Sequence, residues 1–131
     1  MVVLNLKEIF KTRNTYSAYY TLKPEDIKLP ADLGELKEPV HVYVEIKKDK
    51  VGYKVYMEIE GYVVLECSRC LTLYEKDLGR QEVIKIEPYP TRDVVSLRPK
   101  ELEVSFYEDE TAFDLTGLVR EQIILSLPSK P

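Results

Sequence analysis

The alternation of apolar and polar residues between residues 51 and 67 is the longest period-two pattern in the chain. Its odd positions are apolar and its even positions mostly polar: Val51, Tyr53, Val55, Met57, Ile59, Val63, Leu65 and Cys67 against Lys54, Tyr56, Glu58, Glu60, Tyr62 and Glu66. Because successive side chains of a strand point to opposite faces, this pattern predicts a half-buried β-strand. Strands are usually about 5–6 residues long. We therefore expect the run to bend at Gly61, the core-facing position without a side chain.

Two hairpins follow from the segments that flank this run. Residues 40–46 alternate in the same way and are joined to residues 51–60 by a short charged turn, so the two segments should pair antiparallel. Beyond the run, Cys67-Ser68-Arg69-Cys70 leads into a second β-like run over residues 71–86 with no helix signal between them. The cysteine pair is therefore expected at the tip of a hairpin.

The remaining segments are shorter. The other strands predicted are an edge strand over residues 2–6, a tyrosine-rich strand over residues 15–22, and a last strand over residues 101–106. Pro24 opens a helical turn that Pro30 ends. Residues 30–39 and the proline-rich residues 88–99 are expected to form loops.

The hydrophobic period changes near the C-terminus. Asp114 is a good N-cap, and the apolar residues after it recur at helical spacing until Pro128: Leu115, Leu118, Val119, Ile123, Leu125 and Leu127. This predicts a helix over residues 114–127 with a broad apolar stripe. The expected fold is α+β, a curved, mainly antiparallel β-sheet of about six strands with one C-terminal helix packed across it, in a single domain over residues 1–131.

Composition narrows the classes of function. No apolar run approaches the ~20 residues of a membrane span, and the N-terminal segment has no continuous apolar core typical of a signal peptide. We therefore expect a cytoplasmic protein with no membrane contact. The formal net charge of −4 argues against RNA binding by bulk electrostatics, so any RNA contact needs a local basic patch.

Cys67 and Cys70 form the chain's one Cys-x-x-Cys motif. Two thiolates supply half of the four ligands that zinc takes in a structural site, and His41 is the single histidine, so a site within one chain is incomplete without a carboxylate or a second chain. A thioredoxin-like redox pair sits at a helix N-terminus, whereas strands are expected on both sides of this pair. Structural, metal-binding and redox interpretations all stay open.

No enzymatic motif is present, because the chain lacks a glycine-rich phosphate loop and a nucleophile elbow, so we predict a non-enzymatic protein. A basic cluster is the first candidate for partner binding, and edge protection is its alternative explanation. The cluster consists of Lys47, Lys48, Lys50 and Lys54, with Arg69 expected near it. The acidic residues 101–114 are distant in sequence, so we expect a polarised charge distribution. Arg120 and Glu121 on the predicted helix form the competing candidate.

Two segments in this order carry a resemblance to a known family. Residues 61–71 begin with glycine, continue as a strand and end in Cys-Ser-Arg-Cys-Leu, and residues 114–128 begin with Asp-Leu, contain Arg-Glu and end in Leu-Pro. Together they resemble the YceD family, the bacterial or organellar large ribosomal RNA subunit accumulation proteins. The resemblance implies a role in accumulating large-subunit ribosomal RNA, with no established enzymatic activity.

The resemblance also implies a partner, the large-subunit ribosomal precursor, contacted through its protein, its RNA or both. We therefore expect a non-enzymatic assembly adaptor; the alternative is a thiol-dependent redox or metal-handling protein that uses Cys67 and Cys70. Many family members continue past the Leu-Pro with a cysteine-rich tail, whereas this chain ends at Pro131. If tail cysteines complete a metal site in those relatives, Cys67 and Cys70 are half of one, and zinc is expected only where a second chain or such a tail completes the site.

Overall fold

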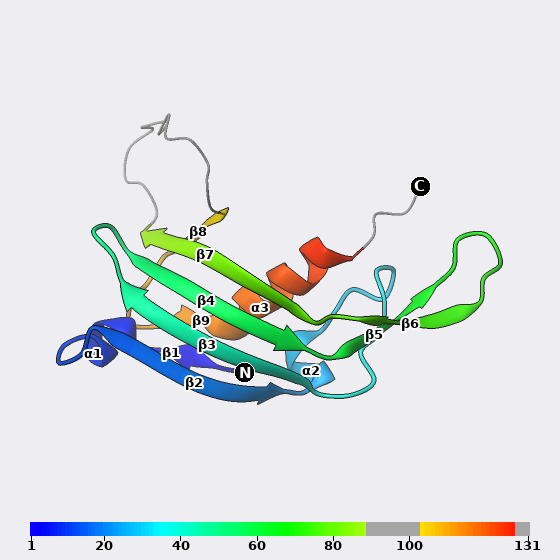
Figure 1. The fold of residues 1–131 in the computed structure, drawn as a ribbon, viewed down its shortest axis with the longest axis horizontal. Coiled ribbons are helices and arrows are strands. Elements are labelled where there is room, and N and C mark those ends of the chain that lie inside the picture. The colour runs from blue at the N-terminus through cyan, green and yellow to red at the C-terminus, as the bar shows by residue number, and fades with distance from the viewer. Residues whose placement is uncertain (89–102, 128–131) are drawn as a thin grey trace.

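The computed structural model describes residues 1–88 and 103–127 of the chain (Figure 1). Its main sheet has five strands in the order β2–β3–β4–β7–β8. They are β2 (Thr15–Leu22), β3 (Val40–Lys48), β4 (Tyr53–Glu60), β7 (Arg80–Pro88) and β8 (Glu103–Tyr107). The first four pair antiparallel, as predicted for residues 40–46 and 51–60, and β8 pairs parallel to β7. The fold is α+β, with a mostly antiparallel sheet and one C-terminal helix, as predicted.

A two-stranded arm continues from the main sheet. It consists of β5 (Tyr62–Glu66) and β6 (Leu73–Asp77), and it projects away from the β3–β4 turn at the opposite end (Figure 1). The long run is interrupted at the predicted position, because Gly61 separates β4 from β5 while Ile59 and Val63 stay buried on the same parity. The cysteine pair lies at the tip of this hairpin, also as predicted.

The base of the arm packs against the loop that precedes β3. Glu35 and Val64 exchange two backbone hydrogen bonds of 2.9 and 2.8 Å. Gly34 makes this approach possible, because a Cβ there would lie 2.8 Å from side-chain carbons of both Val63 and Leu65. The arm is thus tied to the body at its base, and its tip extends beyond these contacts.

One face of the main sheet, which we call the inner face, is covered by the remaining elements. These are β1 (Val3–Leu4), α1 (Leu6–Ile9), α2 (Pro24–Ile27), β9 (Phe113–Asp114) and α3 (Leu115–Ser126). Helix α3 begins where the sequence predicted, because the Asp114 carboxylate accepts a 2.9 Å hydrogen bond from the backbone N–H of Gly117. Leu118, Val119 and Ile123 join the buried cluster formed by the inner-face residues of the sheet.

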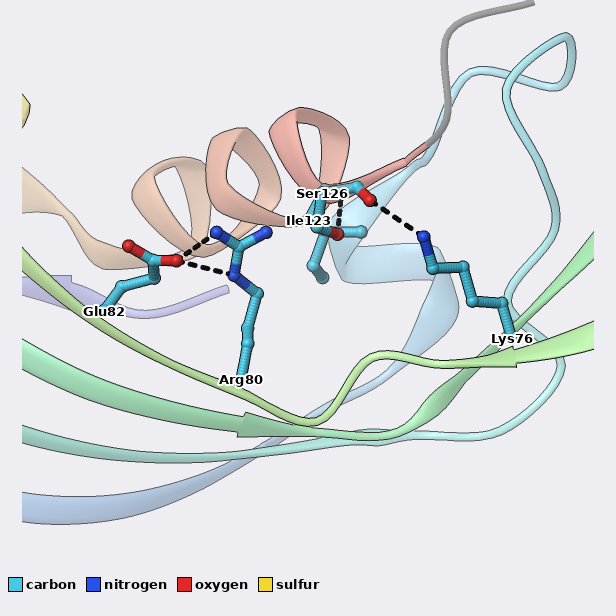
Figure 2. Close-up of polar contacts among 5 residues, drawn as sticks. All are labelled: Lys76, Arg80, Glu82, Ile123 and Ser126. Carbon is cyan, nitrogen blue, oxygen red and sulfur yellow. Dashed lines mark hydrogen bonds and ion pairs between the residues drawn. The ribbon is translucent and has the colours of Figure 1, made fainter.

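Figure 2 shows the polar contacts that lie beneath α3 and at its C-terminal end. Arg80 and Glu82 on β7 form an ion pair on the inner face beneath the helix, with 2.8 Å from Arg80 Nε to Glu82 Oε1. Lys76 on the arm donates a 3.1 Å hydrogen bond from Nζ to the carbonyl oxygen of Ser126 in the last turn of α3. A cation at a helix C-terminus is favourable, so this bond links the arm to the end of the helix.

Several details of the prediction are wrong. The predicted edge strand over residues 2–6 is shortened to Val3–Leu4, because the Asn5 side chain accepts from the Glu8 N–H and starts α1 at Leu6. Val51 is 51% exposed because it lies in the β3–β4 turn rather than in the strand. The main sheet has five strands rather than about six, and the described residues contain four further strands, because glycines divide the long runs and β1 and β9 form a separate short pair.

Two further predictions concern the C-terminal half. Leu125 was placed on the apolar stripe of the helix and is 59% exposed. The predicted loop over residues 88–99 lies outside the described residues except for Pro88, which ends β7. No helix in the described part of the chain is long and apolar enough to cross a membrane.

Candidate functional site

The lysines of the predicted basic cluster lie around the β3–β4 turn. Lys47 on β3 is directly opposite Lys54 on β4, and Lys54 is opposite Lys85 on β7. Residues directly opposite each other share a face, so these three side chains form a row across the sheet on the face opposite α3. Neighbouring strands lie only about 4.8 Å apart, so the three charges are close together. Lys50 in the turn is exposed beside the row, and Lys48 at the end of β3 is exposed on the inner-face side, because it lies opposite the buried Tyr53.

Most of this positive charge is not neutralised. Lys85 lies 3.5 Å from an Asp49 oxygen and 3.8 Å from a Glu87 oxygen. None of Lys47, Lys48, Lys50 and Lys54 forms an ion pair with a carboxylate in the described part of the chain. The backbone N–H of Lys50 and the nearby lysines lower the pKa of Asp49, which keeps that carboxylate ionised as the partner of Lys85. The four lysines remain available to an anionic partner.

The other predicted partner-binding residues lie elsewhere. Arg69 is exposed at the tip of the arm, at the opposite end of the molecule from the lysines (Figure 1), so the structure does not bring it into their cluster. Arg120 and Glu121 lie on α3, on the other side of the sheet. Arg120 is half-exposed, and its Nε donates a 3.4 Å hydrogen bond to the carbonyl oxygen of Lys28.

The expected separation of acidic and basic regions does not hold for Glu110. Its carboxylate accepts a 3.0 Å hydrogen bond from the hydroxyl of Tyr53, the first residue of β4 after the lysine-bearing turn. Glu110 also lies 3.5 Å from the Tyr107 hydroxyl. Glu110 is therefore distant from the lysines in sequence but lies at the same end of the sheet, because β8 and β9 return the chain to this end.

A group of tyrosines and glutamates occupies the middle of the face opposite α3, which we call the open face over β2, β3 and β4. Tyr43 lies opposite Tyr19 on β2 and opposite Glu58 on β4, and Glu45 lies opposite Tyr56. The ring centroids of Tyr19 and Tyr43 are 4.7 Å apart, and those of Tyr43 and Tyr56 are 6.5 Å apart. We call these five residues the tyrosine–glutamate cluster.

The glutamates of this cluster accept hydrogen bonds from its tyrosines. The Tyr56 hydroxyl donates to Glu58 at 2.6 Å, and this bond raises the pKa of Tyr56 to about 12. A hydrogen bond to Glu45 likewise raises the pKa of Tyr43. Tyr19 remains 83% exposed. The cluster thus presents aromatic rings beside two carboxylates that are held in fixed positions.

The cysteine pair lies in the turn between β5 and β6. The turn is closed by backbone hydrogen bonds of 2.9 Å from Cys67 to Thr72 and from Leu71 to Cys67. Both thiols are free, with Cys67 half-buried and Cys70 exposed. Hydrogen bonds from the Thr72 hydroxyl and backbone, together with one from Cys67, lower the pKa of Cys70 to about 7. The turn therefore stabilises a thiolate without a helix N-terminus.

The structure does not bring His41 to this pair. His41 lies opposite Glu60 at the end of β4, and its Nδ1 is 3.3 Å from the Thr21 hydroxyl. Cys67 comes seven positions after Glu60, a span of about 23 Å in extended conformation. Within the described residues, no group of three or more His, Cys, Asp or Glu side chains is arranged to hold a metal ion.

Comparison with protein families identifies the group to which the chain is related. The family model described as "Large ribosomal RNA subunit accumulation protein YceD" matches residues 55–131, more than half of the chain. The chain belongs to the YceD family. No curated protein and no solved structure gives a significant match to the chain.

The matched range contains some of the candidate site residues and not others. The matched range includes the cysteine turn, Arg69, and Arg120 and Glu121 on α3, whereas the four lysines around the β3–β4 turn precede it. The family description connects the chain with large-subunit ribosomal RNA and names no chemical reaction. Our prediction of the family is therefore confirmed, and the role of each candidate site residue stays a prediction.

Sequence reasoning missed three contributors to these sites. Thr72 was not considered as a donor to the cysteine pair, and Tyr19 and Tyr43 were not connected with Tyr56. The strand register joins the tyrosines, because Tyr19 and Tyr43 face each other across β2 and β3. The parity of each strand was visible in the sequence, but the pairing that aligns the strands was not predicted for β2.

Proposed function

We propose that this YceD-family chain is a non-enzymatic cytoplasmic adaptor in the accumulation of large-subunit ribosomal RNA. It contacts the RNA of the large-subunit precursor through the lysine end, defined as Lys47, Lys48, Lys50 and Lys54. The observation that carries the proposal is the row formed by Lys47, Lys54 and Lys85 on the open face, with Lys50 exposed in the turn beside it and Lys48 exposed on the inner-face side of the same strand end.

Physical support comes from the local balance of charge. Lysines contact phosphates as compact charges, and each phosphate that is bound releases counterions and so adds to affinity at low salt. A chain of net charge −4 gains nothing from its overall field. A contact with RNA therefore depends on a patch of this kind, in which four exposed lysines lack described carboxylate partners.

The test replaces Lys47, Lys48, Lys50 and Lys54 together with glutamine. We expect weaker capture of large-subunit precursors from cells, and a log–log salt dependence of RNA binding that is smaller by about 0.7–0.9 for each phosphate that the variant no longer neutralises. The matched control replaces Lys23, Lys28, Lys37 and Lys76, four lysines that lie away from the β3–β4 turn, with glutamine. The control has the same net charge and should keep both properties.

Helix α3 is the competing contact surface for the precursor, so a variant of α3 is tested beside the lysine variant. If the lysine variant captures precursors normally while Arg120→Glu abolishes capture in a protein that remains folded, the lysine end is not the contact surface. A deletion strain with normal large-subunit RNA levels would contradict the adaptor role itself. These two results are distinguishable, because the first rejects only the lysine end as the contact surface and the second rejects the role in large-subunit RNA accumulation.

A second candidate function is favoured by the cysteine turn. The exposed Cys70, with its pKa lowered to about 7, has the thiolate character of a nucleophile in thiol–disulfide exchange. Its thiolate would attack a disulfide of a partner protein, forming a mixed disulfide and releasing the partner's other sulfur as a thiolate. Cys67 would then displace the partner and close a Cys67–Cys70 disulfide, leaving the partner reduced.

Trapping distinguishes this redox role from the adaptor role. A Cys67→Ser variant should accumulate mixed disulfides in cells, and Cys70→Ser should not, because the attacking thiol is then absent. Alkylation of Cys70 should follow a pH profile with its midpoint at about 7. A midpoint near 8.5, the value of an ordinary thiol, together with no trapped partner would contradict the redox role.

A metal-handling role requires more ligands than one chain brings together among its described residues. We propose that the purified monomer holds no stoichiometric zinc, because two thiolates leave a four-ligand site half complete. Metal analysis that finds one zinc per monomeric chain would overturn this. One zinc per two chains would indicate a site shared by the cysteine turns of a dimer.

A further inference from the structure

The open face has two chemically different zones. Toward the β3–β4 turn it carries the row of Lys47, Lys54 and Lys85. The tyrosine–glutamate cluster begins at the next pair of residues on this face, Glu45 and Tyr56. Glu60, opposite His41, adds an exposed carboxylate beyond the cluster. The middle of the open face is therefore aromatic and acidic, in contrast to the basic row beside it.

The arrangement of the cluster suits a planar cation. Glu45 and Glu58 lie on adjacent strands, and each is directly opposite a tyrosine of the other strand. Tyr19, 83% exposed, stacks at an interplanar angle of 41° against Tyr43. A guanidinium group can lie on an aromatic ring and at the same time donate two hydrogen bonds to a carboxylate. An ammonium group gains the charge attraction without the paired hydrogen bonds.

The same chemistry disfavours a nucleic acid at this zone. Bases stack well on exposed tyrosines, but the phosphates that accompany them would approach Glu45, Glu58 and Glu60. Both cluster carboxylates accept hydrogen bonds from tyrosine hydroxyls, and the raised pKa values of Tyr43 and Tyr56 reflect that. Charge complementarity therefore favours a positively charged polypeptide over RNA.

We propose that the tyrosine–glutamate cluster is a docking site for an arginine-rich segment of a partner protein. Arginine side chains stack on Tyr19 and Tyr43 and pair with Glu45 and Glu58, while the lysine row repels further positive charge and so fixes where the segment ends. This inference goes beyond the proposed contact with RNA and does not depend on it, because the two zones use different residues. Together they would let one face hold protein and RNA side by side.

The experiment uses the purified full chain and synthetic peptides of one length. The probe repeats arginine and glycine; the comparison peptides replace arginine with lysine or with the neutral analogue citrulline. Calorimetric titration should give the tightest binding for arginine, weaker binding for lysine and none for citrulline. The variant Glu45→Gln/Glu58→Gln should weaken arginine-peptide binding about tenfold or more, as expected for loss of charge-assisted pairs.

Matched controls separate the site from bulk charge. Glu66→Gln/Glu75→Gln removes two exposed carboxylates from the arm and should change affinity less than about twofold. Tyr19→Ala should weaken binding several-fold, whereas Tyr62→Ala, an exposed tyrosine on the arm, should not. Because Tyr19 and Tyr62 are both exposed, these variants are expected to fold.

Three results would overturn the proposal. The first is no binding of the arginine peptide, and the second is an equal loss of binding in the cluster and arm variants. The third is binding of single-stranded RNA that strengthens in Glu45→Gln/Glu58→Gln and weakens in Tyr19→Ala, which would make the cluster an RNA platform. The lysine-end variant leaves peptide binding unchanged or stronger, so failure here is distinct from failure of the proposed function.

Discussion

The inner and open faces of β3 and β4 consist of alternate residues of the same two strands, yet they have opposite properties. On the inner face, Val44, Val55 and Met57 are fully buried. On the open face, their neighbours Tyr43, Glu45 and Tyr56 are half-exposed and interact mainly with one another. Burial of apolar area accounts for most of the stability of a domain, so the inner face determines the fold and the open face is available for recognition.

The largest expected difference between the two faces is seen at adjacent residues of β4. Met57→Ala removes a fully buried side chain and leaves a cavity under α3, which should lower the free energy of unfolding by about 2–5 kcal/mol. Tyr56→Ala removes a half-exposed cross-strand contact and should cost about 1 kcal/mol or less. Urea unfolding measures both. Equal losses would show that the open face also carries the fold.

A smaller effect is expected where the helix that covers the inner face begins. Asp114→Ala removes the acceptor for the Gly117 N–H and should cost about 0.5–2 kcal/mol. Asp114→Asn keeps a side-chain oxygen at the cap and is the matched control, with a loss of a few tenths of a kcal/mol. If the asparagine variant is as unstable as the alanine variant, the carboxylate charge rather than the hydrogen bond stabilises the helix.

The inner face was largely predictable from the sequence, because burial follows the alternation of side chains. The odd positions of residues 53–65 and the helix stripe after Asp114 gave the main elements and most of the core. The exceptions have local causes. Asn5 caps a helical turn inside the expected edge strand, and Val51 falls in a turn whose position depends on Gly52, which has a φ of +81°.

The open face was harder to predict, because its interactions cross strands whose register is not encoded locally. Tyr56 stands at an outward-facing position of the alternating pattern, but its neighbours Tyr43 and Glu45 become visible only once β3 and β4 are aligned. Arg69 was expected near the lysines because both belong to hairpins, and the extension of β4 into β5 carries it to the other end. The parallel pairing of β8 likewise depends on long-range topology.

The Arg80–Glu82 ion pair is a polar contact on the otherwise apolar inner face, and it allows a weaker test of the difference between the two faces. Arg80 and Glu82 pair beneath α3 with about a quarter of each side chain exposed (Figure 2). A double-mutant cycle with Arg80→Met and Glu82→Met should give a coupling of about 0.5–1 kcal/mol, since partial exposure screens the pair. Each single variant leaves one charge unpaired and should be less stable than wild type in urea unfolding. The double variant leaves no unpaired charge and should be close to wild type. Zero coupling would indicate that the Arg80–Glu82 pair adds nothing to the stability of the inner face.

The smallest effect concerns the open face itself and appears only at high pH. The hydrogen bond to Glu58 raises the pKa of Tyr56 from 10.0 to about 12, so the neutral hydroxyl is favoured in the folded chain. This contribution to stability is fully present below the unfolded pKa of about 10 and is lost as the pH rises through about 12. The chain has no tryptophan, so ultraviolet absorbance reports tyrosinate directly. The difference between the wild-type titration and that of Tyr56→Phe should show one late-titrating tyrosine, and Glu58→Gln should return it toward about 10. Circular dichroism over the same range identifies the pH at which the fold is lost. If the late component persists in Glu58→Gln while the fold is intact, the carboxylate does not hold the Tyr56 hydroxyl, and the open face is less ordered than the register of β3 and β4 implies.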